Sequence, residues 1–138
     1  MYNVVPTPTL LTQLTALLAE YPTTSLVHLY TNNFQPTPAS VVGDFTEATF
    51  TGYTAATLTA FGTPFLNAAN NAQSVAPGIT FTCTGTTVTQ TVYGYFITDV
   101  HGTTLLLSGL FDTPVNMNAV GVGFVFVPSL ELGGLTSS

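Results

Sequence analysis

The residues best suited to chemistry in this chain are an acid and an imidazole two positions apart, Asp99 and His101, with Ser108 and Cys83 as the obvious nearby nucleophile candidates. Acyl transfer would require a base within hydrogen-bonding reach of the nucleophile, an acid that orients the base, and an oxyanion site. The sequence Asp-Val-His-Gly instead predicts a tight turn, in which Asp99 accepts backbone N–H bonds and Gly102 takes a positive φ. We therefore predict no catalytic residue and no enzyme activity.

Metal-binding residue types are few and scattered. His28 and His101 lie far apart in the sequence, and no HxH, HExxH or CxxC spacing occurs. Asp44 and Glu47 do not match the twelve-residue ligand pattern of an EF-hand loop, and predict a capped turn in which Asp44 accepts amide bonds and Glu47 reaches back to the backbone. We predict no metal site and no cofactor. A calcium ion that takes one carboxylate from each subunit of an oligomer is the alternative left open.

The remaining reactive or aromatic side chains favour packing over chemistry. Cys83 alternates with Ile79 and Phe81, which predicts a buried and inert thiol. Three tyrosines allow either a sugar-binding platform or, more commonly for such residues, core packing and protein contacts: Tyr53, Tyr93 and Tyr95.

The composition excludes several classes of function. The 138 residues contain no Lys and no Arg, and six acids give a formal net charge of −6. Nucleic-acid binding through phosphate neutralisation, bidentate Arg clamps and basic patches for anionic lipid all require those side chains. Charged residues make up 4% of the chain, against about 25% in an average domain. We expect a surface that is largely covered by other proteins, with no nucleic-acid or membrane partner.

Length and composition favour one domain over residues 1–138, with a core large enough to need no disulfide. The single cysteine allows no disulfide within the chain. The first ten residues lack the basic and apolar regions of a secretory signal, and no stretch approaches the ~20 apolar residues of a membrane span. We expect synthesis in the cytoplasm.

One amphipathic helix is expected at residues 8–21. A single apolar stripe recurs there at helical spacing and consists of Leu10, Leu11, Leu14, Leu17, Leu18 and Tyr21. Thr7 can cap this helix, Pro8 suits its first position, and Pro22 ends it. The stripe predicts that the helix lies on the sheet or docks into a neighbouring protein.

Residues 25–133 read as a β domain, since 27 threonines and alternating apolar positions favour strands. A short helical turn is expected within 39–53 and a long exposed loop at 62–78. Strands are expected at 25–33, 54–61, 79–84, 87–98, 103–111 and 120–132. Their number and spacing predict an antiparallel sandwich or small barrel.

Residues 26–53 (LVHLYTNNFQPTPASVVGDFTEATFTGY) resemble a group of small β-rich proteins associated with the virions of tailed bacteriophages and prophages. In that group an L-x-L-[YF]-x-N strand leads into P-T-P and then D-F-T-E-A-x-F-x-G-Y. The pattern is carried here by Leu29, Tyr30, Asn32, Pro36, Thr37, Pro38, Asp44, Phe45, Thr46, Glu47, Ala48, Phe50, Gly52 and Tyr53. Segments 81–85, 92–99 and 125–132 are also similar to the group. The resemblance implies a virion protein and brings no catalytic residue with it.

We therefore expect a bacteriophage virion structural protein, most specifically a capsid decoration or cement protein. It would be located in the virion and form a homo-oligomer, with a trimer suited to three-fold capsid positions, in contact with the major capsid or tail protein. The candidate interface residues are Leu10, Leu14, Leu17, Tyr21, Phe65 and Leu66. The alternatives are a tail or fibre subunit, a carbohydrate-binding receptor module that uses 62–78 and exposed tyrosines, and, remotely, a hydrolase.

Overall fold

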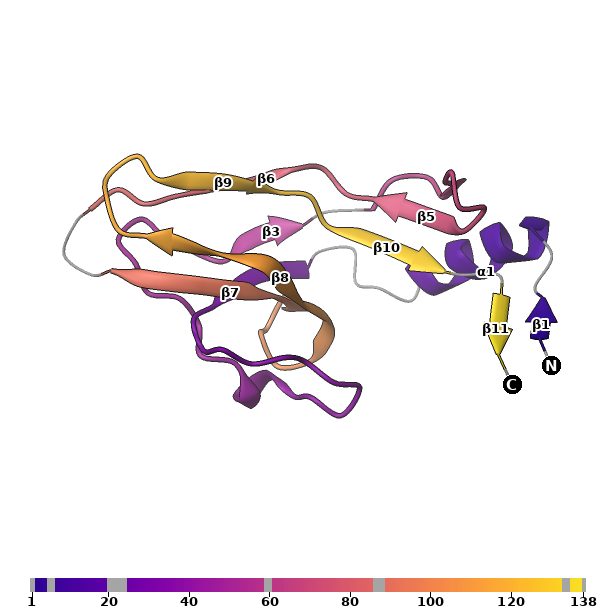
Figure 1. The fold of residues 1–138 in the computed structure, drawn as a ribbon, viewed down its shortest axis with the longest axis horizontal. Helices are drawn as coiled ribbons and strands as arrows, with labels where there is room; N and C mark the ends of the chain where they lie inside the picture. The colour runs from indigo at the N-terminus through magenta and orange to yellow at the C-terminus, as the bar shows by residue number, and fades with distance from the viewer. Residues whose placement is uncertain are drawn as a thin grey trace. The chain divides into compact units, whose positions relative to one another are not determined.

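The computed structural model describes residues 2–4, 7–19, 25–58, 61–85, 89–132 and 135–137. Within these ranges the fold is mainly β, with antiparallel strand pairs and one α-helix near the N-terminus, as predicted (Figure 1). The elements are β1 (Tyr2–Val4), α1 (Thr7–Ala19), β2 (Ser25–Tyr30), the 3-10 turn η1 (Val42–Asp44), β3 (Ala56–Leu58), β4 (Phe65–Leu66), β5 (Ala72–Val75), β6 (Ile79–Thr82), β7 (Gln90–Asp99), β8 (Leu105–Met117), β9 (Gly123–Phe126), β10 (Ser129–Leu132) and β11 (Leu135–Ser137).

The chain divides into two compact units. Unit 1 comprises Met1–Thr23, Ala60–Gly78 and Val127–Ser138, and unit 2 comprises Thr24–Thr59 and Ile79–Phe126. The expectation of one domain over 1–138 stays a prediction, and each unit is described by itself below. No helix among the described residues is long and apolar enough to cross a membrane.

In unit 1, α1 packs on a three-stranded antiparallel sheet of order β10–β5–β4. Leu14 of the predicted stripe is fully buried against Ala72 of β5. Leu11 and Leu18, one helical turn to either side, and Leu130 of β10 complete this small core. The helix therefore lies on the sheet, which is one of the two placements its leucine stripe predicts. β1 pairs with β11 in a separate two-stranded sheet.

The prediction of a long exposed loop at 62–78 is wrong. Residues Phe65–Leu66 and Ala72–Val75 form the β4–β5 hairpin. Asn67 holds the connecting turn, because its side-chain oxygen accepts from the Ala69 and Asn71 amides at 3.0 and 3.1 Å. The inward positions of β5 carry the small residues Ala72 and Ser74, so the apolar–polar contrast that indicates a strand is weak in this segment.

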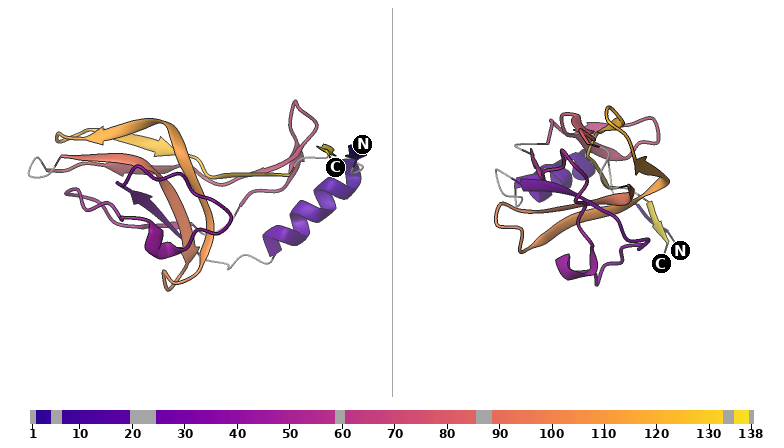
Figure 2. Two further views of the ribbon diagram at one scale, coloured as in Figure 1. Left: turned by 60° about the horizontal axis from the view of Figure 1, so that its bottom comes forward. Right: turned by 90° about the vertical axis from the view of Figure 1, so that its left-hand side faces the viewer.

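Unit 2 contains a four-stranded antiparallel sheet of order β3–β2–β7–β8 and a second, two-stranded sheet, β6–β9 (Figures 1 and 2). Aromatic contacts connect the two sheets. Tyr95 lies 4.4 Å from Phe126 between ring centroids, and Phe111 lies 5.7 Å from Phe124. Among the described strands these sheets form layers with free edges and no closed barrel, so the sandwich is the better of the two predicted architectures.

The opposite face of the four-stranded sheet is covered by the segment between β2 and β3. Phe45 from this segment stacks on Phe96 of β7 at 4.7 Å and contacts Tyr30 of β2 at 5.0 Å. The segment contains the predicted helical turn, η1. Tyr30 reaches across β7 at Gly94, where any Cβ would meet the Tyr30 hydroxyl oxygen at 2.6 Å. Glycine is required at this crossing.

The strand predicted at 120–132 is divided into β9 and β10. Residues Val127 and Pro128 fall between them, and proline cannot donate to a strand ladder. β9 pairs with β6 in unit 2, whereas β10 pairs with β5 in unit 1. Phe124 and Phe126 lie on one face of β9, as predicted, and both contact the aromatic layer of unit 2.

Candidate functional site

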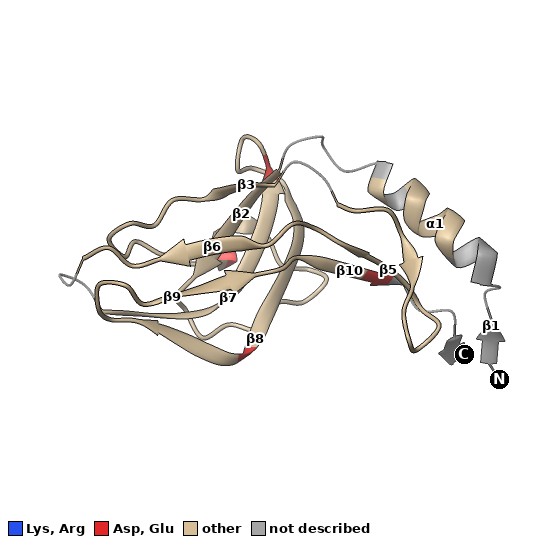
Figure 3. Ribbon diagram, turned by 90° about the horizontal axis from the view of Figure 1, so that it is seen from above, with Lys and Arg blue, Asp and Glu red and all other residues tan. Residues whose placement is uncertain are grey.

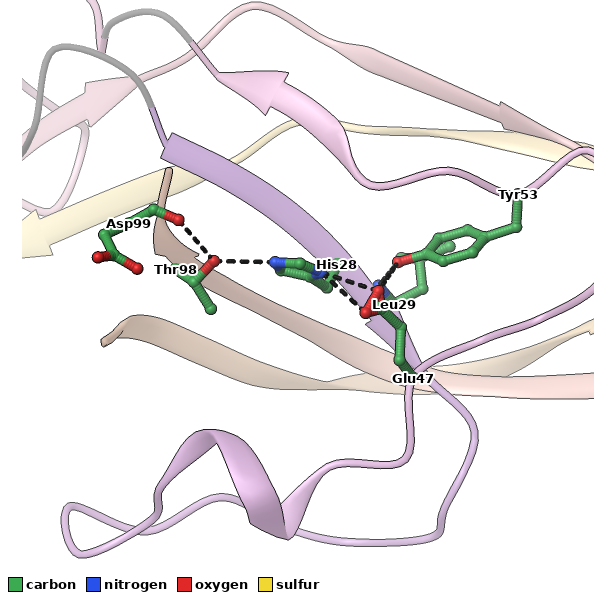
Figure 4. A network of polar contacts seen from close by, with 6 residues as sticks. All are labelled: His28, Leu29, Glu47, Tyr53, Thr98 and Asp99. Carbon is green, nitrogen blue, oxygen red and sulfur yellow. Dashed lines mark hydrogen bonds and ion pairs between the residues drawn. The ribbon is translucent and has the colours of Figure 1, made fainter. Parts of the chain in front are cut away.

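A polar cluster in unit 2 is centred on His28 of β2 (Figure 4). Its Nδ1 lies 2.9 Å from Oε2 and 3.2 Å from Oε1 of Glu47. Its Nε2 lies 2.9 Å from Oγ1 of Thr98 on β7. His28 is 7% exposed, and its ring stacks on Phe96 at 4.6 Å with an interplanar angle of 8°. The imidazole is thereby fixed in position and orientation.

Strand register explains how this cluster forms. β2 pairs with β7 so that His28 lies opposite Phe96, with Thr98 two residues further along the same face. A β-bridge between Glu47 and Tyr30 brings Glu47 to the same face. Backbone hydrogen bonds from the Thr31 amide to the Thr46 carbonyl and from the Ala48 amide to the Leu29 carbonyl hold this segment beside β2.

Tyr53 extends the cluster on the other side of Glu47. The Leu29 amide donates to the Tyr53 hydroxyl at 3.1 Å, and this hydroxyl donates to Oε2 of Glu47 at 3.1 Å. Burial raises the pKa of Tyr53 well above its usual value, and the nearby Glu47 charge raises it further, while the Leu29 bond acts in the opposite direction. Tyr53 therefore stays neutral and serves as a donor to Glu47.

Glu47, His28 and Thr98 follow the order acid, imidazole, hydroxyl that is found in catalytic triads. Thr98 is, however, completely buried, and its hydroxyl also lies 2.9 Å from the Asp99 carbonyl oxygen. A nucleophile must be reached by its substrate, which this threonine is not. The arrangement is suited to fastening the 45–53 segment onto β2 and β7, and we interpret it as structural.

The turn after β7 has the structure predicted for Asp-Val-His-Gly. Oδ1 of Asp99 accepts from the Thr103 and Thr104 amides at 2.8 and 3.1 Å, and Gly102 has a φ of 72°. These amide bonds, chiefly that from Thr104, hold the pKa of Asp99 below its ordinary value, with a minor contribution from His101. The carboxylate of Asp99 is thus engaged in the turn.

The other nucleophile candidates are placed apart from this turn. Cys83 is buried, as predicted, and its thiol donates to the Gly85 carbonyl at 3.0 Å. Ser108 lies opposite Phe96 in the β7–β8 register. No contact between described side chains joins Asp99 or His101 to either residue, so these candidates do not form one site.

The prediction of a capped turn at 44–47 is wrong in its position. The capped turn is η1, with Val41 at its N-cap, and Asp44 is the residue that reaches back, since its Oδ2 accepts from the Val41 amide at 2.9 Å. Glu47 bonds to His28 and Tyr53 instead. Sequence analysis missed the pairing of His28 with Glu47 because 19 positions separate them. The available signal was a histidine within an apolar strand, since a buried imidazole requires polar partners.

Metal-ligating side chains do not gather in the part of the chain that the structure describes, where His, Cys, Asp and Glu form no group of three or more. Figure 3 shows the acidic residues dispersed over separate elements. The absence of a cofactor stays a prediction.

The predicted interface residues have different environments. Leu14 is buried inside unit 1 and is not available to a partner in this structure. Phe65 and Leu66 are 44% and 38% exposed at β4. Leu10 and Leu17 belong to α1, but their side chains lie outside the description, and Tyr21 falls outside the described residues. Phe65 and Leu66 on β4 remain candidate interface residues.

Two adjacent grooves run along β8 in unit 2. One, of about 400 Å³, is lined by Leu105–Ser108, and the other, of about 440 Å³, by Ser108–Asp112. Residues 35–40 form the opposite wall, and both grooves share Pro36 and Ser108. Apart from the Gln35 amide, their lining is apolar and hydroxylic, with Asp112 as its only charge.

Comparison of the chain with protein-family models, with curated proteins and with solved structures finds no match.

Proposed function

We propose that this chain is a bacteriophage virion structural protein that acts through protein–protein contacts, most specifically a capsid decoration or cement protein that works as an oligomer. The resemblance of residues 26–53 to virion-associated phage proteins supports the class. The buried state of Thr98 and the engagement of Asp99 in its turn support a protein without enzyme activity.

The observation that carries this proposal is the exposure of large apolar side chains on a surface that has few charges. Val120 and Val125 are 64% and 62% exposed, and further exposed apolar residues are Val41, Phe65, Leu66, Val100, Leu110 and Val127. Single exposed apolar residues are common, but soluble surfaces usually separate them with Lys, Arg, Asp and Glu. Here the six acids are the only residues of that kind. Such a surface suits a subunit held among other proteins.

A tail or fibre subunit is the alternative within the same class, since the resemblance does not distinguish positions in the virion. A carbohydrate-binding module receives less support. Tyr53 packs against Phe50 and Phe81, and Tyr95 packs against Phe111 and Phe126, so both rings are engaged in packing within unit 2.

Quantitative mass spectrometry of purified particles tests the proposal. We expect the chain at a fixed stoichiometric ratio to the major capsid protein, retained through density-gradient purification. Chelator treatment should leave that ratio unchanged. A chain recovered only in the unassembled lysate fraction would contradict the proposal.

A further inference from the structure

The three-stranded sheet of unit 1 has a second face, opposite the one on which α1 packs. The helix covers the face that carries Ala72 and Leu130, and side chains that alternate with these along β5 and β10 point the other way. On β4, Phe65 lies opposite Gln73 and so shares this second face. We call it the outward face, and it consists of Phe65, Asn67, Asn71, Gln73, Ser129 and Glu131.

Hydrogen bonds between side chains fix the polar groups of the outward face. Nδ2 of Asn67 donates to Oε1 of Gln73 at 3.2 Å, and Nε2 of Gln73 donates to Oγ of Ser129 at 2.8 Å. Nδ2 of Asn71 donates to Oε1 of Glu131 at 2.6 Å. Each bond uses one N–H of an amide group that has two, and one oxygen of the carboxylate. The face is therefore a preorganised array that can donate and accept further hydrogen bonds.

Phe65 adds an aromatic ring to this array. It is 44% exposed and contacts no other aromatic ring among the described residues, unlike Tyr53 and Tyr95 of unit 2. The strand register places Phe65, Gln73 and Glu131 in one row across β4, β5 and β10. Neighbouring strands are about 4.8 Å apart, so the row is about 10 Å long. It presents a ring, an amide and a carboxylate in that order.

These groups match the chemistry of a sugar. A pyranose ring has a C–H face that can pack on an aromatic side chain, and its hydroxyls both donate and accept hydrogen bonds. Charge restricts the kind of sugar, because Glu131 repels carboxylate, sulfate and phosphate groups and the chain has no Lys or Arg to bind them. A covering protein would have to match all five polar side chains of the face or leave some of them buried and unsatisfied.

We propose that the outward face of the unit 1 sheet binds a neutral oligosaccharide. Phe65 packs on the C–H face of one sugar ring, and the Gln73 amide and the Glu131 carboxylate bond to hydroxyls of the sugar beside it. This inference goes beyond the proposed role in assembly, since it gives the subunit a ligand outside the particle.

The probes are three neutral oligosaccharides, maltohexaose, mannohexaose and chitohexaose, each titrated into the ¹⁵N-labelled full chain. We expect saturable amide shifts concentrated at residues 65–73 and 129–131 with at least one of them. The matched control is the same oligosaccharide with its C6 hydroxyls oxidised to carboxylates, which should bind at least about tenfold more weakly.

Substitutions on the two faces of β4 separate sugar stacking from general effects on the sheet. Phe65→Ala should weaken binding at least about tenfold, whereas Phe65→Tyr, which keeps the ring, should bind within about threefold of the original chain. Leu66→Ala is the matched control, because Leu66 lies opposite Ala72 on the other face, and it should leave binding unchanged. Far-UV circular dichroism should show that all three variants remain folded.

Several results would overturn the inference. No shifts with any of the three probes at millimolar concentration, shifts outside the outward face, or equal binding by Phe65→Ala would each exclude sugar stacking there. Equal binding of the oxidised control would refute the selection of neutral sugars. Shifts at 65–73 that depend on protein concentration without sugar would assign the face to a second copy.

Particle composition separates this inference from the proposed function. A chain present in particles but inert to all three sugars refutes only the inference. A chain that binds sugar but is absent from particles refutes only the proposed function.

Discussion

We expect Thr98→Val to lower the free energy of unfolding by about 1–3 kcal/mol, the usual cost of leaving a buried polar group without its partner. Valine keeps the branched shape of threonine and suits β7, so packing changes little. The substitution removes the hydroxyl 2.9 Å from Nε2 of His28, and water cannot readily replace it because His28 is 7% exposed. The Asp99 carbonyl still accepts from the Gly102 amide at 3.1 Å, so His28 bears the loss.

Urea unfolding followed by far-UV circular dichroism measures this change, since the chain contains no Trp. With a urea dependence of about 1–3 kcal/mol/M, a loss of ~2 kcal/mol lowers the midpoint by roughly 1 M. The matched control is Thr80→Val at an exposed strand position, which should change stability by less than about 0.5 kcal/mol.

A second background tests the cause of the loss. His28→Phe retains a flat ring against Phe96 and removes the nitrogen that needs Thr98. In that background Thr98→Val should cost less than about 0.5 kcal/mol, because replacing both partners of a bond by apolar groups leaves nothing unsatisfied. Equal costs in the two backgrounds would refute the assignment of the loss to His28.

Three further predictions follow from the packing and titration of the core. Gly94→Ala should destabilise by about 1–3 kcal/mol, since its Cβ would meet the backbone carbonyl oxygen of Gly109 and, at 2.6 Å, the Tyr30 hydroxyl oxygen. Gly43→Ala, with nothing within 4 Å, should be near neutral, and equal urea midpoints for the two variants would contradict this. Leu14→Ala should cost about 2–5 kcal/mol by opening a cavity under α1, and a loss below 1 kcal/mol in thermal unfolding would show that the helix is not anchored there. Burial, with a smaller contribution from Tyr95, raises the pKa of Tyr30 to about 12, and burial also raises the pKa of Tyr53. The stability that both tyrosines provide is therefore complete below pH 10, and it is lost as the pH rises through their pKa values in the folded chain. Absorbance at 295 nm should show two tyrosines ionising only with alkaline unfolding, and all six ionising near pH 10 in the folded chain would contradict this.

Elements with strong periodicity were predictable from the sequence. The leucines of α1 recur at helical spacing, so the helix was expected at 8–21 and is found at Thr7–Ala19. Alternating positions likewise indicated β2, β6 and β7. The Asp99 turn was predictable because Asp and Gly have local conformational preferences that need no distant partner.

Features that depend on distant contacts were not predictable. The β4–β5 hairpin buries alanine and serine, which give little contrast with the polar residues between them. Val127 and Pro128 end β9, but only the pairing of β10 with β5 reveals that the next strand belongs to another sheet. The role of Glu47 depends on His28, 19 positions earlier, and local spacing favoured a cap instead.

The role of this chain as a virion structural protein is tested by a cryo-EM map of the native particle in which the chain is located. We expect density for the chain at a fixed copy number on the capsid lattice, with its exposed apolar residues against neighbouring proteins. Density confined to the tail would instead favour a tail or fibre subunit over a capsid decoration protein. A particle with no density for the chain would contradict its role as a virion structural protein.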